Sequence, residues 1–162
     1  MEVPAIIDLE ASGFGRGSYP IEVGIALQDG SVHALLIQPA ESWTHWDESA
    51  EAIHGISREY LMAHGKTPRE VALYLNDMCS GTTLYSDAWS FDSSWLGRLF
   101  DEAEIIQRFR LDTITRLLTE DEMSHWSDTK DAMVKELQLE IHRAANDVTL
   151  LRETFKRIKA TL

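Results

Sequence analysis

Short apolar runs separated by polar turns predict that the chain begins with strands. Residues 3–9 form one such run, and residues 21–28 form a second after a stretch rich in Gly and Ser. The pair Asp29-Gly30 is a strong signal for a two-residue turn, so residues 31–38 are expected to return antiparallel to the second strand. The pattern therefore predicts three consecutive strands, of which the last two form a hairpin.

Helical periodicity follows and alternates with two further short strands. Ser57 and Thr67 stand where side-chain caps of helices are expected, and Pro68 suits a first helical position. The expected helices cover residues 58–63, 69–79, 91–102, 113–118, 129–139 and 144–162, and the expected strands cover 82–86 and 105–111. The acidic stretch 119–131 is interpreted as an exposed connection. This order predicts an α/β fold with a mixed five-stranded sheet flanked by helices.

Length and composition limit the kind of protein that this chain forms. Its 162 residues contain no internal repeat and no linker, so a single domain over residues 1–162 is expected. An apolar content of 44% excludes a disordered acidic tail. No apolar stretch approaches the roughly 20 residues of a membrane span, and no secretory signal is recognised. With Cys79 as the single cysteine, these features predict a cytoplasmic protein with no membrane partner.

Two carboxylates stand at the end of the first predicted strand. Asp8 and Glu10 are two residues apart, so their side chains point to the same face of that strand. Paired carboxylates make a poor core and a good site for Mg²⁺ or Mn²⁺, which favour carboxylate oxygen and water. The pair alone is a weak signal and favours a solvated strand end, because 27 of the 162 residues are Asp or Glu.

Two other segments place acidic or imidazole groups near the start of a predicted helix. His142 and Asp147 lie five residues apart, with the small residues Ala144 and Ala145 between them. Asp92 falls in the first turn of the helix after the fourth strand, where an anion interacts favourably with the helix dipole. Each segment also has an ordinary interpretation, as a surface pair in the first case and as part of a capped helix start in the second.

Together these residues form a specific pattern, in the order Asp8, Glu10, Asp92, His142 and Asp147. With this pattern the sequence resembles the DnaQ-like (DEDDh) 3′→5′ exonuclease superfamily, of the ribonuclease T and proofreading-exonuclease type. The resemblance extends from Ile6 to Leu151. It implies a ribonuclease H-like fold in which three antiparallel strands come first.

The family motifs are read as follows: D-x-E-x-[TS]-G at residues 8–13, apolar-His-Gly-Ile-[ST] at residues 53–57, Phe-Asp at residues 91–92, Asp-Thr at residues 112–113, and H-x-A-x-x-D at residues 142–147. One departure lies ahead of the second catalytic motif. Family members often carry His-Asn-Ala there, whereas this chain reads Asp87-Ala88-Trp89. Asp87 is therefore an alternative or additional ligand, although the Phe-Asp pairing favours Asp92.

The resemblance implies release of nucleoside monophosphates from the 3′ end of single-stranded DNA or RNA by two-metal-ion hydrolysis. Asp8, Glu10 and Asp147 would bind the first Mg²⁺ or Mn²⁺ ion, and Asp8 would bridge to the second. Asp92 would act on the second ion through ordered water. His142 would be the general base, a task that suits imidazole because its ordinary pKa is about 6.5.

Substrate contacts are expected in the glycine-containing loop and at one other histidine. Backbone amides of Ala11, Ser12 and Gly13 are expected to approach the terminal nucleotide, because Gly13 has no side chain to hinder it. Phe14 is expected to stack on a base, with a partly buried loop anchor as its alternative role. His54 is expected to line the cleft, with a capped helix start as its alternative.

The net charge of −12 runs against the basic face that nucleic-acid binders usually carry. Four of the acidic residues are proposed ligands, and the last helix is locally basic, with Arg152, Lys156, Arg157 and Lys159 against Glu153. Attraction for phosphate is therefore expected around the metals and that helix, which favours short or end-limited substrates.

Two other functions compete with the exonuclease hypothesis. A ribonuclease H-type endonuclease would share the fold and the acidic site, but the H-x-A-x-x-D motif disfavours it. A non-catalytic nucleic-acid-binding or scaffold module would explain the acidic surface, although all five key residues are present. The sequence leaves the oligomeric state open, with a homodimer among the options.

Overall fold

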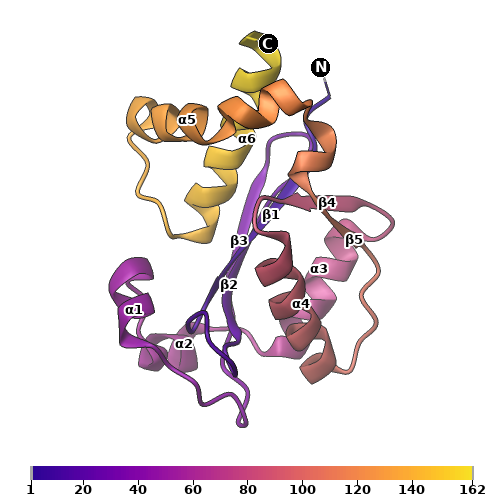
Figure 1. Ribbon diagram of the computed structural model, residues 1–162. Helices are drawn as coiled ribbons and strands as arrows, with labels where there is room; N and C mark the ends of the chain where they lie inside the picture. The colour runs from indigo at the N-terminus through magenta and orange to yellow at the C-terminus, as the bar shows by residue number, and fades with distance from the viewer. Residues whose placement is uncertain (1, 162) are drawn as a thin grey trace.

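A five-stranded sheet lies between two groups of helices in the computed structural model, which describes residues 2–161 (Figure 1). The strands are β1 (Ala5–Ala11), β2 (Pro20–Ala26), β3 (Val32–Leu36), β4 (Thr83–Ser86) and β5 (Arg110–Thr113). Their spatial order is β3-β2-β1-β4-β5, with β1, β2 and β3 antiparallel and with β4 parallel to both β1 and β5. The predicted mixed sheet with three antiparallel strands first is confirmed.

The helices divide between the two faces of the sheet (Figure 1). They are α1 (Glu48–His54), α2 (Arg58–His64), α3 (Pro68–Cys79), α4 (Trp89–Ala103), α5 (Glu120–Leu137) and α6 (Ala144–Thr161), with a 3₁₀ turn at Ile114–Leu117. Helices α3 and α4 lie on one side, and α6 lies on the other with α5 packed against it. In residues 2–161 no helix combines the length and apolar character needed to cross a bilayer.

Alternation along β1 assigns its residues to two cores. Ile7 and Leu9 are buried in the core that includes the buried residues of α3 and α4, whereas Ile6 is buried in the core that includes α6. Because neighbouring strand residues point to opposite faces, Asp8 and Glu10 share the α6 face with Ile6. The register of β1 against β2 shifts between Glu10 and Ala11, so the strand pairing becomes irregular directly after the second carboxylate.

A close backbone contact fixes the start of α6 against the sheet. Gly24 of β2 lies opposite Asp8 in the strand register. A Cβ atom at Gly24 would lie 2.5 Å from the carbonyl oxygen of Ala144, so only glycine permits this approach. Ala144 is fully buried. The small residues at these two positions therefore bring the first turn of α6 alongside the carboxylates of β1.

The expectation that residues 119–131 form an exposed connection is wrong. They belong mostly to α5, which begins after a capping box in which the Thr119 side chain accepts from the Glu122 amide and Glu122 accepts from the Thr119 amide. Acidic residues in the first turn also favour the helix start through its dipole. A polar composition therefore coexists with a regular helix here.

Other element boundaries also differ from the expected ones. Helix α1 was not expected, although Asp47 caps its first turn and Gly55 ends it with a φ of 72°. Strand β5 begins at Arg110 rather than at residue 105, and the helix expected over 113–118 is a 3₁₀ turn capped by Thr113. The caps at Ser57 and Thr67 are confirmed, and the last predicted residue of the final helix, Leu162, lies outside the described residues.

The basic side chains of α6 pair with other groups of the protein, which reduces the positive charge that this helix offers to phosphate. Arg157 pairs with Glu136 of α5 at 2.9 Å, and Lys159 pairs with the buried Glu122 of α5 at 2.8 Å. The remaining contacts are Arg152 to the carbonyls of Leu27 and Gln28, and Lys156 to Glu153 at 3.4 Å. Arg157 and Lys159 thereby link α6 to α5, and each of the four cations has a partner that offsets part of its charge.

Candidate active site

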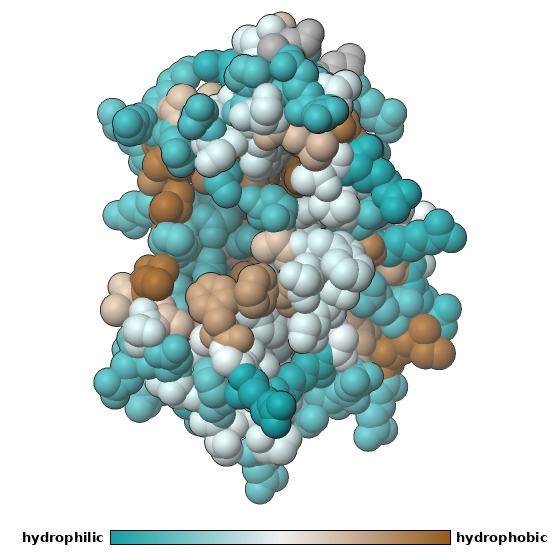
Figure 2. All heavy atoms as spheres, in the orientation of Figure 1, coloured by the Kyte–Doolittle hydropathy of each residue, from teal (hydrophilic) through white to brown (hydrophobic). Residues whose placement is uncertain are grey.

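One cavity collects side chains from β1, α4, the segment before α6 and the first turn of α6. All five residues of the sequence pattern line it: Asp8, Glu10, Asp92, His142 and Asp147. Four of the five expected substrate contacts line it as well: Ala11, Gly13, Phe14 and His54. In Figure 2 this face shows apolar residues around a hydrophilic hollow. Segments that are far apart in the sequence therefore meet at one acidic cleft.

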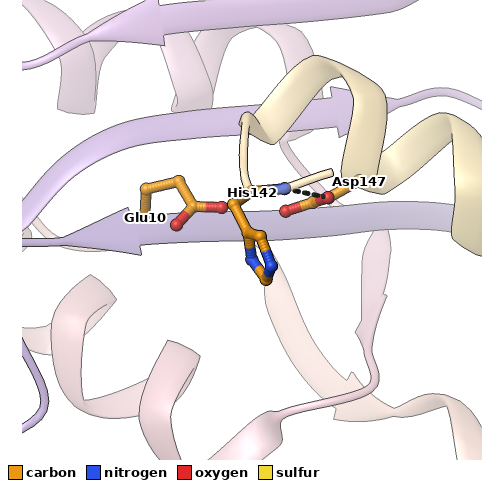
Figure 3. Close-up of side chains that lie close together, drawn as sticks. All are labelled: Glu10, His142 and Asp147. Carbon is orange, nitrogen blue, oxygen red and sulfur yellow. Dashed lines mark hydrogen bonds between the residues drawn. The ribbon is translucent and has the colours of Figure 1, made fainter. Parts of the chain in front are cut away.

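Glu10, His142 and Asp147 form the tightest group in this cleft. One carboxylate oxygen of each acid and one imidazole nitrogen lie within 4.8 Å of one another (Figure 3). The backbone N–H of His142 donates to Asp147 Oδ1 at 2.9 Å, which ties the segment before α6 to the first turn of that helix. His142 itself has a φ of 72°, in the left-handed region that non-glycine residues rarely adopt.

Asp8 lies deep in the cleft with one oxygen that has no hydrogen-bond partner. Among residues 2–161, its Oδ2 is one of two buried side-chain polar atoms without a hydrogen-bond partner. Burial raises the pKa of this carboxyl well above its ordinary value, and the negative charges of Asp147, Asp92 and Glu10 raise it further. A buried, unpaired carboxylate is unfavourable by itself, so this position calls for a cation.

The pKa values of two neighbouring carboxyls are raised for related reasons. Burial raises the pKa of Glu10 to about 9, with further contributions from hydrogen bonding to Asp147 and from the charges of Asp147 and Glu22. Burial raises the pKa of Asp92 to about 7, even though the hydrogen bond from Ser86 favours its ionised form. That bond joins Ser86 Oγ to Asp92 Oδ2 at 2.5 Å. Repulsion among these acids would fall if a divalent cation bound between them.

The residues present fit such a cation. The donor set consists of carboxylate oxygens and one imidazole nitrogen, and hard divalent ions such as Mg²⁺ and Mn²⁺ favour oxygen ligands. The unpartnered Asp8 Oδ2 supplies a free ligand atom beside this set. The geometry differs in one respect from the expected first-ion set, because it groups His142, rather than Asp8, with Glu10 and Asp147.

The structure also separates the two candidates for the fourth carboxylate. Asp92 is buried and lines the cleft, whereas Asp87 is not among the lining residues. Asp87 instead forms an ion pair with Lys130 of α5, at 3.0 Å between Oδ2 and Nζ. The charge of Asp87 contributes to the raised pKa of Asp92, so it lies near the site without opening into it.

We expect Asp92→Asn to lower metal-dependent turnover by about a hundredfold or more, because it removes a carboxylate from the cation site. Asp87→Asn is expected to change turnover by less than about tenfold, since its carboxylate is already neutralised by Lys130. Steady-state hydrolysis of a labelled oligonucleotide measures both. The reverse ranking would make Asp87 the ligand.

Phe14 stands at the mouth of the cleft with 68% of its surface exposed. Its ring meets Phe91 edge-on at 5.3 Å between centroids, and Phe91 stacks on Trp95 at 5.6 Å. Trp95 is buried and donates from Nε1 to Ser18 Oγ, so it anchors this aromatic row. Phe14 is therefore open to a planar ligand rather than buried as a loop anchor.

Ser12 does not take the place expected for it. Its side chain is fully buried, where Oγ accepts from the Tyr19 amide and bonds to His45 Nδ1 at 2.9 Å. Its own amide donates to the Tyr19 carbonyl at 3.0 Å. The Ser12 amide therefore has no free hydrogen for a substrate, and the residue instead closes the loop that presents Gly13 and Phe14.

His54 lines the cleft from the end of α1. Its Nδ1 accepts from the Ile56 amide at 3.0 Å, so the neutral ring carries its proton on Nε2. Burial lowers the pKa of this imidazole, which keeps the ring neutral near pH 7. Within residues 2–161, Nε2 is the other buried side-chain polar atom that lacks a hydrogen-bond partner.

Two features of the cleft escaped sequence reasoning. Ala50 and Ile53 of α1 form part of its wall, and the cap at Asp47 together with Gly55 was the local signal for that helix. Glu22 of β2 is buried next to the site and binds Arg143. A glutamate in an otherwise apolar strand signals a buried partner, but it does not say which residue that partner is.

Solved structures of exonuclease I are similar to this chain. The Escherichia coli enzyme in complex with a dA16 oligonucleotide matches with a TM-score of 0.73 at 13% identity, over 99% of this chain and 41% of that chain. The zinc-bound complex of the same enzyme with single-stranded DNA gives 0.74 at 13% identity, with the same shares of each chain. A further exonuclease I structure gives 0.76 at 13% identity, again over 99% and 41%. The chain has the exonuclease I fold.

The exonuclease I fold is what the resemblance to DnaQ-like enzymes implied, so that expectation about architecture is confirmed. This chain spans about two fifths of the length of the exonuclease I chains that it matches. No family model matches the sequence, and no curated protein sequence is significantly similar to it.

Proposed function

We propose that this chain is a metal-dependent 3′→5′ exonuclease that releases nucleoside monophosphates from single-stranded DNA or RNA. The observation that carries the proposal is the acidic cluster, in which Asp8 keeps a buried, unpartnered oxygen and Glu10, His142 and Asp147 converge within 4.8 Å. Its position in a fold shared with exonuclease I supports the same conclusion. A cluster of this kind destabilises the protein unless a cation binds there.

In this proposal Asp8, Glu10, Asp92 and Asp147 hold two Mg²⁺ or Mn²⁺ ions. When bound, such ions make water a better nucleophile and neutralise charge that develops on the leaving 3′-oxygen. The carboxylates orient the phosphodiester by placing these charges at a fixed depth in the cleft. Because the pKa values of Glu10 and Asp92 are raised, these two acids release protons when a metal ion binds to them.

His142 would accept the proton of the attacking water on an imidazole nitrogen. Its ring extends beside the Glu10 and Asp147 carboxylates, as Figure 3 shows, so a water activated near those acids lies within its reach. The same closeness gives His142 a second candidate role as a direct metal ligand. Substitution separates the two roles, because only a ligand contributes to metal affinity.

We expect His142→Ala to lower turnover by about a hundredfold or more, the usual contribution of a general base. If His142 acts as a base, Mn²⁺ affinity measured by calorimetry in the same variant changes little. A loss of Mn²⁺ affinity equal to that in Asp8→Asn would make His142 a ligand and contradict the general-base role.

The apolar end of the cleft would receive the terminal nucleoside. Phe14 and Phe91 offer aromatic faces for a base, a contact worth about 1–3 kcal/mol per base in single-strand binders. His54 would contribute a neutral imidazole to the wall of this site. A site built for one nucleoside at a chain end favours exonucleolytic over internal cleavage.

The experiment that tests the function compares linear and circular single strands of DNA and RNA with Mg²⁺, with Mn²⁺ and with neither ion. We expect a ladder of shortened 5′-labelled products and free nucleoside monophosphates from the linear strands, and no cut in the circles. Cleavage of circles would identify an endonuclease of ribonuclease H type. Absence of any product with either metal would favour the non-catalytic binding module.

A further inference from the structure

An ion pair between the buried Glu22 and the partly exposed Arg143 helps to fasten the two residues that follow His142 to the sheet. Arg143 donates to Glu22 through both arms of its guanidinium, from Nε at 3.1 Å to Oε1 and from Nη2 at 2.9 Å to Oε2. The amide of Ala144 donates to the same Oε1 at 2.9 Å. Glu22 therefore accepts three hydrogen bonds, all from the two residues that follow His142.

Glu22 and Glu10 lie opposite each other on neighbouring strands, yet they have different partners. Glu22 is 3% exposed and fully engaged by Arg143 and Ala144. Glu10 has no such cation, and its pKa is raised to about 9. The strand pair thus separates a carboxylate available for a metal from one that is committed to the protein. Glu22 is not one of the residues that the sequence pattern singled out.

His142 needs this support because of its backbone conformation. A side-chain-bearing residue with a φ of 72° is disfavoured and persists only where its surroundings impose it. On its N–H side, Asp147 accepts the His142 amide. On its carbonyl side, Arg143 and Ala144 are bound to Glu22, and Ala144 is pressed against Gly24. Residues 139–143, which precede α6, belong to no helix or strand that could hold His142 in place.

We propose that Glu22 and Arg143 are positioning residues that hold His142 in its left-handed conformation, and so aim its imidazole beside Glu10 and Asp147. The proposal rests on the nuclease function of this cleft for its kinetic consequences, but not for its structural ones. Arg143 is suited to the task because a bidentate guanidinium–carboxylate pair fixes orientation as well as distance. Lysine would keep the charge without the fork.

The test uses Arg143→Met, Arg143→Lys and Glu22→Gln, with Arg152→Met as the matched control. Arg152 lies on α6, which begins directly after Arg143, and it binds the carbonyls of Leu27 and Gln28, but it is not among the residues that line the cleft. We expect kcat to fall about tenfold to a hundredfold in Arg143→Met, with KM and Mn²⁺ affinity within about twofold of the wild type. Arg143→Lys should recover only part of the loss, and Arg152→Met should leave kcat unchanged.

A double substitution keeps the proposal testable if Arg143→Met folds poorly because it strands the Glu22 charge. Glu22→Gln with Arg143→Met removes both charges, and we expect kcat to be no lower than in the worse single variant, because the two residues act as one unit. Equal losses of kcat in Arg143→Met and Arg152→Met would overturn the proposal. So would a loss of Mn²⁺ affinity equal to that in Asp8→Asn, since the pair would then position the carboxylates.

A readout without turnover separates this inference from the proposed function. Bound Mn²⁺ broadens the NMR signals of nearby protons, so the imidazole signals of His142 report its distance from the acidic cluster. We expect strong broadening in the wild type and in Arg152→Met, and at least about threefold less in Arg143→Met. Unchanged broadening in Arg143→Met overturns the inference, whereas a wild type without nuclease activity but with this difference overturns only the proposed function.

Discussion

Asp8→Asn is expected to abolish turnover and, at the same time, to stabilise the metal-free protein. Its carboxylate is buried beside Asp147, Asp92 and Glu10, and its Oδ2 has no partner. Asparagine has the same shape without the charge, so it removes the repulsion while keeping the packing. We expect the free energy of unfolding at about pH 8 to rise by roughly 1–3 kcal/mol and turnover to fall by about a hundredfold or more.

Thermal unfolding with and without Mn²⁺ measures the stability of the metal-free protein and the stabilisation that the metal provides. The wild type should gain stability from Mn²⁺, and Asp8→Asn should gain much less, because ligand binding to the folded state alone stabilises it. Asp77→Asn is a suitable control, since that residue is exposed on α3 and far from the cleft. A metal-free Asp8→Asn protein that unfolds more easily than the wild type would contradict the account of Asp8 as an uncompensated charge.

The second large effect is a loss of stability with rising pH in the absence of metal. The pKa values of Glu10 and Asp92 in the folded protein, about 9 and about 7, exceed those of the unfolded chain. The folded state therefore binds these protons more tightly. The contribution of the two groups to the free energy of unfolding is fully present below about pH 4 and is lost as the pH rises through about 7 and about 9. We expect a decrease on the order of 2–4 kcal/mol between about pH 5 and about pH 8.5.

Calorimetric melting in a chelator checks this trend, which should appear as a decrease in Tm of roughly 5–12 °C over that interval. Mn²⁺ should reverse it, and its stabilising effect should grow with pH because the ligands must be deprotonated. In the Glu10→Gln variant the decrease should be clearly smaller. A metal-free Tm that rises steadily from about pH 5 to about pH 8.5 would contradict the raised pKa values.

Local signals in the sequence predicted most of the architecture. Ser57 and Thr67 cap helices through contacts within three residues, and the Asp29-Gly30 turn joins two strands directly, so no distant contact is needed to recognise them. A helix was predicted over residues 129–139, but the first half of α5 was missed because the acidic composition of residues 119–131 outweighed the capping box at Thr119. Tertiary contacts stabilise this segment as a helix, since the buried Glu122 forms an ion pair with Lys159 on α6.

The candidate site followed from spacing where both partners lie on one element. Asp8 and Glu10 share a strand face, and His142 and Asp147 lie within about one turn of the start of α6, so local geometry indicated each pair. That these pairs meet at one cavity was expected only from the family resemblance. The Glu22–Arg143 pair joins residues 121 positions apart, and no periodicity in the chain connects them.

The ion pairs of α6 have a consequence for how binding depends on ionic strength. The affinity of a protein for nucleic acid falls as the salt concentration rises. The steepness of this fall increases with the number of phosphates that lysines and arginines neutralise, because each such contact releases counterions. Arg157 and Lys159 are already paired with α5, and Arg152 is bound to backbone carbonyls. Affinity for a single strand should therefore change only a few-fold between roughly 50 and 200 mM salt, the behaviour of a ligand held by one or two phosphates and a stacked base.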